Sequence, residues 1–201
     1  MPPQQPAASP AIKPGLSKEQ IAELVAARDR ATKLRRAAGV ARFDGWMVAS
    51  FAVLTGLTGF SSFSTLLLAA GMGYVAWREF RGAEQFRRLD PTAAPALAIN
   101  QLVLAGILIV YALWQAYQSA TAPSDLSAMT GGDAQLSNMI GPIDHLIRLL
   151  TLSVYGLIVL VAIFVQGGTA LYYHSRQRFV KDYIARTPAW IIELQRAGVA
   201  V

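Results

Sequence analysis

Four runs of sequence almost without charge most constrain what this chain can fold into. They cover about residues 43–60, 63–79, 96–117 and 146–173. Each is near the length of about 20 residues that an α-helix needs to cross a bilayer. Because backbone polar groups in lipid must be satisfied within the spanning segment, we expect helices there rather than open strands. The sequence therefore predicts an all-α integral membrane protein whose core is a four-helix bundle.

The distribution of positive charge predicts the orientation of these spans. Seventeen of the 18 Lys and Arg residues lie in three segments, Lys13–Arg42, Arg78–Arg88 and Arg176–Arg196, and the exception is Arg148. The first two spans lie between the first and second of these segments, and the last two spans lie between the second and third. Since cytoplasmic loops are enriched in Lys and Arg, we expect both termini and the middle segment in the cytoplasm. The Ala-, Gly- and Arg-rich composition favours a bacterial inner membrane.

The first 42 residues divide into two parts. Residues 1–16 are Pro-rich and lack the apolar core of a signal peptide, so we expect a disordered tail. Residues 17–42 predict a basic amphipathic helix, with Ser17 and Gln20 at the spacing of a capping box. This helix either lies on the membrane surface or packs on the cytoplasmic ends of the spans. We expect Gly39 to end it and Asp44 to cap the first span.

The first two spans are short. Eighteen residues reach roughly 27 Å, just below a typical hydrocarbon thickness, so a re-entrant hairpin is the alternative to two full spans. Residues 78–90 follow as a mixed-charge connector. The membrane domain as a whole is expected to cover residues 43–175.

Two further segments lie outside the spans in the second half of the chain. The longest loop is expected at residues 118–144, where Gly141-Pro142 should stop any short helix before it. Residues 176–201 form a cytoplasmic C-terminal tail. Within that tail, Thr187-Pro188 precedes a short helix with an apolar side, which we expect to lie along the membrane interface.

Polar amides inside the spans predict a contact between helices. Asn100 and Gln101 lie near the cytoplasmic end of the third span, and Gln166 lies near the same end of the fourth. The two spans run in opposite directions, so these side chains fall at similar depth. Because amides in lipid need partners, we expect interhelical polar contacts among the three residues.

Arginines just beyond the ends of the spans are candidates for contacts with lipid headgroups. An arginine at this depth can meet the phosphate of an anionic lipid. The candidates are Arg35, Arg36, Arg87, Arg88, Arg176 and Arg178.

The sequence offers no motif for catalysis, cofactor binding or metal binding. It contains no cysteine, and its two histidines, His145 and His174, are about 43 Å apart along one helix. No histidine base stands near a span serine, so no catalytic triad is expected. No carboxylate lies at a span centre, where a coupled carrier usually has one. The net charge of +6 follows from the orientation rule, and we expect no nucleic-acid partner.

These patterns favour a non-enzymatic membrane protein, an accessory or assembly component that binds partners through its cytoplasmic face. Its expected partners are the lipid bilayer and other membrane protein subunits. The alternative is a small oligomeric channel or uncoupled carrier. In that case Asn100, Gln101, Gln115 and Gln166 would line the path.

Overall fold

The computed structural model describes residues 15–60, 62–121 and 134–199, and it is all-helical over these ranges. The helices are α1 (Lys18–Thr58), α2 (Phe63–Arg87), α3 (Ala93–Thr121), α5 (Ala134–Val161), the π-helical turn η1 (Ala162–Gln166), α6 (Gly167–Arg186) and α7 (Ala189–Arg196). Within these ranges, three helices are long and apolar enough to cross a membrane: α1, α3 and the continuous helix from Gly141 to Arg186. The chain is therefore a candidate membrane protein.

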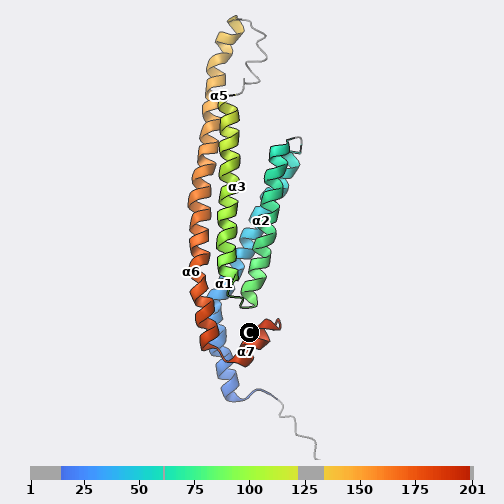
Figure 1. Cartoon of the computed structure of the whole chain (residues 1–201), viewed down its shortest axis with the longest axis vertical. Helices are drawn as coiled ribbons and strands as arrows, with labels where there is room; N and C mark the ends of the chain where they lie inside the picture. Colours follow the sequence, from blue (N-terminus) through green and yellow to red (C-terminus); the bar gives the residue numbers. More distant parts are fainter. Residues whose placement is uncertain (1–14, 61, 122–133, 200–201) are drawn as a thin grey trace, which may run out of the picture.

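The long helices run side by side along the longest axis of the molecule (Figure 1). α1 and α2 form an antiparallel hairpin, and α3 packs between α2 and the continuous helix formed by α5, η1 and α6. The hairpin and α3 share an apolar cluster that includes Val48, Met72, Val75 and Leu104. Small residues allow α1 and α2 to approach, since a Cβ at Gly56 would lie 3.7 Å from Ala69 Cβ.

α1 is one uninterrupted helix, so the expected break near Gly39 is wrong. A single glycine costs a helix only about 1 kcal/mol, and alanines at positions 37, 38 and 41 are buried around it. The capping box is confirmed: Ser17 N donates to Gln20 Oε1 at 2.9 Å, and Gln20 N donates to Ser17 Oγ at 3.2 Å. Residues 18–42 therefore extend the axis of the candidate span and do not lie across it.

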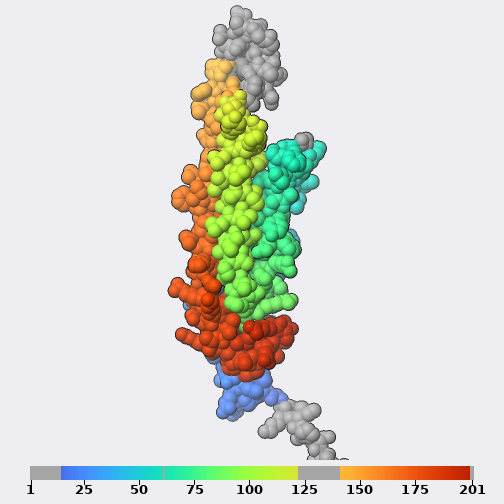
Figure 2. All heavy atoms as spheres, in the orientation of Figure 1, coloured from blue at the N-terminus to red at the C-terminus, as the bar shows by residue number. Residues whose placement is uncertain are grey.

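The three Lys- and Arg-rich segments meet at one end of the molecule, which we call the basic end (residues 18–42, 80–92 and 174–199). One buried cluster joins Leu34 of α1, Phe86 of α2, Tyr183 of α6 and Ile192 of α7. Figure 2 shows the C-terminal residues, in red, covering the lower ends of α3 and α2. Trp190 Nε1 also donates to Glu23 Oε2 at 3.0 Å. The first part of α1 thus packs on the ends of the other helices.

Two expected boundaries differ from the structure. α2 continues through the expected connector to Arg87, and α5 begins at Ala134 and passes through Pro142. Charged residues at one end of α2 shorten its apolar run without ending the helix. Residues 1–14 of the expected tail and 122–133 of the expected loop lie outside the described residues. After the expected break at Thr187-Pro188, the structure has the short helix α7.

Candidate functional site: a buried acid–amide cluster and a basic pocket

Side chains from four helices meet in a buried polar cluster where the candidate spans enter the basic end. We call it the acid–amide cluster; it consists of Asp44 on α1, Glu79 on α2, Asn100 and Gln101 on α3 and Tyr173 on α6. Asn100 Nδ2 donates to Glu79 Oε1 at 2.7 Å and to the carbonyl of Val75 at 3.0 Å. Gln101 Nε2 donates to Glu79 Oε1 at 2.9 Å and also to Asp44 Oδ2.

Glu79 is the centre of this cluster. It is fully buried, and so are Gln101 and Tyr173. The hydroxyl of Tyr173 donates to Glu79 Oε2 at 3.4 Å. Within the described residues, no lysine or arginine forms an ion pair with Glu79 or Asp44. Neutral donors therefore replace water around the carboxylate, which satisfies the hydrogen-bonding requirement of a buried polar group.

Local sequence explains why Glu79 points inward. Met72, Val75, Glu79 and Phe86 follow one another at helical spacing and share the buried face of α2. Gly45 then lets α1 come close to this face: a Cβ at that position would lie 3.1 Å from Glu79 Cβ. The close approach brings Asp44 within reach of Gln101.

The predicted amide contacts are only partly brought together. Asn100 and Gln101 make interhelical hydrogen bonds, but to α1 and α2 instead of to Gln166. Within the described residues, the side chain of Gln166 makes no hydrogen bond. α3 still packs against η1 and α6 at this depth. Gln115 belongs to a second polar layer, where its Nε2 lies 3.3 Å from Tyr111 Oη and 3.5 Å from Tyr155 Oη.

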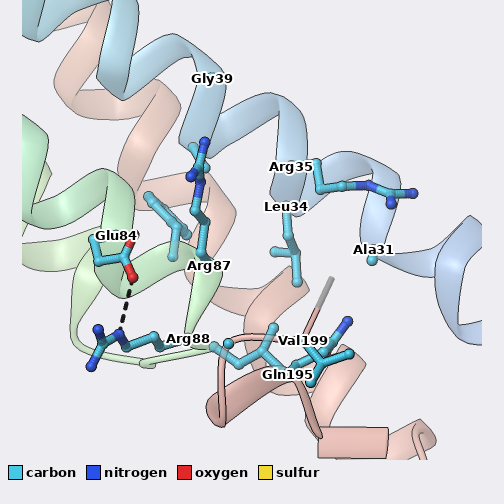
Figure 3. Close-up of a pocket in the computed structure, with 13 residues that line it drawn as sticks. Ala31, Leu34, Arg35, Gly39, Glu84, Arg87, Arg88, Gln195 and Val199 are labelled. Carbon is cyan, nitrogen blue, oxygen red and sulfur yellow. Dashed lines mark hydrogen bonds and ion pairs between the residues drawn. The ribbon is translucent and has the colours of Figure 1, made fainter. Parts of the chain in front are cut away.

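A pocket of about 500 Å³ lies at the basic end, between α1, the end of α2 and the segment that follows α7. We call it the basic pocket. Figure 3 shows Arg87 reaching across it toward Gly39, with Leu34 and Val199 on the other side. Arg88 lies on the rim and pairs with Glu84, with Nε and Oε1 3.1 Å apart. Arg35 also lines the pocket, and its Nη2 donates to the carbonyl of Arg28 at 2.8 Å.

The six predicted headgroup arginines lie in three places. Arg35, Arg87 and Arg88 line the basic pocket. Arg176 instead stacks over Tyr172, with 4.3 Å from Cζ to the ring centroid, and Arg178 lies 5.7 Å from the ring of Phe179. Arg36 is exposed on α1 outside the pocket.

Sequence reasoning missed Asp44, Glu79 and Tyr173 as members of one cluster. It placed Asp44 at a helix start and Glu79 in a connector, because both lie where an apolar run meets charge. The spacing of Glu79 on the apolar face of α2 was the signal that could have identified it. No local signal pairs it with Tyr173, which is 94 residues away.

The described residues contain no group of three or more His, Asp or Glu side chains that could hold a metal ion. The site is therefore described by its hydrogen bonds and by the arginines of the pocket. Comparisons with protein family models, with curated proteins and with solved structures find no match.

Proposed function

We propose that this chain is a non-enzymatic integral membrane protein with four spans, an accessory or assembly component that binds a protein partner through its basic end. In this proposal α2 is the fourth span, both termini and the basic end are cytoplasmic, and the membrane is a bacterial inner membrane. The support comes from the arrangement of the basic segments, from the acid–amide cluster and from an exposed apolar stripe on α1.

The meeting of all three basic segments favours an even number of crossings. Leu34, Leu89 and Ile192 represent the three segments within one buried cluster. Segments that touch one another lie on the same side of a membrane. Suppose that α1 and the helix from Gly141 to Arg186 both cross the membrane fully. Their basic ends are in contact and so lie on one side, which supports a return of the chain through α2 before α3 begins.

The spacing of the two polar layers agrees with a bilayer. Tyr173 of the acid–amide cluster and Tyr155 of the second layer are 18 residues apart on one continuous helix, about 27 Å. That distance is close to the hydrocarbon thickness of about 30 Å. Large apolar side chains between the layers, such as Leu57, Phe164 and Leu171, are exposed on the surface of the chain. They suit contact with lipid.

The exposed apolar stripe on α1 carries the partner-binding part of the proposal. Ile21 is 50% exposed and Val25 is 56% exposed, one helical turn apart. Because α1 is one continuous helix from Lys18 through residue 44, Ile21 stands about 35 Å from Asp44 along the helix axis. Lipid that surrounds the spans does not reach this distance. Apolar side chains exposed there favour a protein partner.

The acid–amide cluster favours an accessory role over a channel or carrier. Asn100 and Gln101, which a transport path would use, donate to Glu79 and Asp44. These bonds join α1, α2 and α3 at one depth. Amide nitrogens held in this way stabilise one packing of the helices.

The test is cross-linking of the full chain in native membranes, followed by purification in mild detergent. The matched variants are Ile21→Ser with Val25→Ser, which remove the stripe, and Lys18→Ser with Asp29→Ser, which change exposed charges on the same segment. We expect the first pair to abolish a discrete cross-linked species and the second to retain it. A protein recovered alone under all conditions, or solute flux in liposomes that Gln115→Leu abolishes, would contradict the proposal and favour the channel.

A further inference from the structure

The position of the basic pocket relative to the apolar surface identifies the layer of the membrane that it would face. The pocket reaches Gly39 on α1. Val40, the next residue, is 40% exposed and begins the dense apolar surface that includes Phe43 and Trp46. Arg87 lies two turns beyond Phe80, which packs edge-on against Trp46 at 5.4 Å. Because tryptophan marks the membrane interface, the pocket falls at the level of the headgroups.

The lining of the pocket is amphipathic. Leu34, Phe86 and Leu89 form an apolar floor, and all three are buried. Arg87 is exposed above this floor and has no hydrogen bond or ion pair within the described residues. Among the described residues of the lining, Glu84 is the one carboxylate, and it is paired with Arg88. The pocket therefore offers positive charge next to apolar surface.

We propose that the basic pocket binds the phosphate of an acidic phospholipid. Arg87 meets the phosphate, and Arg35 and Arg88 provide positive charge at the rim. Val199, which lines the pocket and is 52% exposed, contacts the glycerol backbone and the first methylenes above the buried floor. Anionic headgroups pair well with guanidinium groups, and the apolar floor suits a lipid better than a free anion. The inference rests on the membrane orientation in the proposed function and is independent of the partner at Ile21.

Gly39 provides a way to close the pocket without disturbing the fold. A Cβ at this position meets no other atom within 4 Å, so a larger side chain has room. Gly39→Ala leaves the pocket open and Gly39→Trp fills it. Arg36→Gln matches Arg87→Gln in charge, and Arg36 lies outside the pocket lining.

The experiment measures lipid retained by the full chain in detergent by native mass spectrometry. Phosphatidylglycerol, phosphatidylcholine and inorganic phosphate are the three probes. We expect one retained phosphatidylglycerol, an affinity about fivefold lower for Arg87→Gln, and little binding to Gly39→Trp. Arg36→Gln should behave like the unmodified chain, and Gly39→Ala should retain more phosphatidylglycerol than Gly39→Trp. Thermal unfolding of each variant checks that it is folded.

Three outcomes would overturn the inference. Equal losses of affinity for phosphatidylglycerol in Arg87→Gln and Arg36→Gln would show that the lipid is attracted to the basic surface in general. Equal retention of phosphatidylcholine would remove the selectivity for negative charge, and competition by inorganic phosphate at millimolar concentration would identify a free-anion site. Failure of the proposed function is distinguishable, because it would appear as a chain that is not extracted with membranes or as an unmodified chain that forms no discrete cross-linked species.

Discussion

At the scale of the residue, Glu79 is the side chain whose replacement tests the acid–amide cluster most directly. Glu79→Leu removes the acceptor of one N–H of Asn100, of one N–H of Gln101 and of the Tyr173 hydroxyl, while the bonds from Asn100 to Val75 and from Gln101 to Asp44 remain. Each unsatisfied donor costs about 1–3 kcal/mol, so we expect a loss of about 3 kcal/mol or more in the free energy of unfolding. Thermal unfolding in detergent, followed by circular dichroism, measures it.

Glu84→Leu is the control for this substitution. Glu84 lies on the same helix, its side chain is 53% exposed, and its pair with Arg88 spans one turn. Such pairs contribute at most about 0.5 kcal/mol. Glu79→Gln, which keeps one acceptor oxygen, should fall between the two. Equal melting temperatures for Glu79→Leu and Glu84→Leu would show that the cluster does not stabilise the fold.

The sequence predicted that amides in α3 would bond between helices, and it did not predict their partners. The need of Asn100 and Gln101 for a partner is a property of their own helix, which a single sequence displays. The choice of Glu79 over Gln166 depends on how close α2 comes to α3 and on the direction in which each face points. Those quantities arise from packing between segments that are far apart in the chain.

At the scale of the element, the contact between α2 and α3 depends on the absence of a side chain at Gly82. A Cβ there would lie 2.5 Å from Leu97 Cγ, and Leu97 is almost fully buried. We expect Gly82→Ala to destabilise the protein by about 1–3 kcal/mol through overpacking. Gly106→Ala on α3, where a Cβ meets nothing within 4 Å, is the control and should not lower the melting temperature. Unchanged stability for Gly82→Ala would contradict this packing.

The short helix α7 depends on its contacts with the body of the protein. Eight residues are too few for a stable isolated helix in water, so the burial of Ile191 and Ile192 must hold it. We expect Ile191→Ala to cost about 2–5 kcal/mol of docking free energy. Hydrogen exchange of residues 189–196 should then become faster while exchange in α3 stays unchanged. Leu194→Ala, at a more exposed position, should have little effect.

Helix type could be predicted along most of the chain, and helix ends were predicted less well. Apolar runs identified α1, α2, α3 and the long helix from Gly141 to Arg186, because burial in lipid or protein needs such runs. The ends were misplaced at Gly39, at Arg78 and at Pro142. A glycine, a charge or a proline weakens a helix locally, and contacts with neighbouring helices decide whether it continues.

At the scale of the whole molecule, the number of crossings can be tested with introduced thiols. The chain has no cysteine, so each introduced one is the only target of a membrane-impermeant maleimide. For four spans we expect Ala22→Cys, Arg88→Cys and Arg196→Cys to be labelled from the cytoplasmic side, and Ser62→Cys from the opposite side. Labelling of Ser62→Cys from neither side would support the re-entrant hairpin. Labelling of Arg88→Cys from the outer side would contradict the proposed orientation.

Asp44 divides the continuous helix α1 into two arms of unequal length. Asp44 is held by the acid–amide cluster, so a tilt of α1 would turn about this residue. The arm that ends at Thr58 is about 21 Å long, and the arm that ends at Lys18 is about 39 Å long. A tilt of the hairpin about Asp44 would therefore displace Ile21, about 35 Å away, about 1.6 times as far as the hairpin turn, and in the opposite direction.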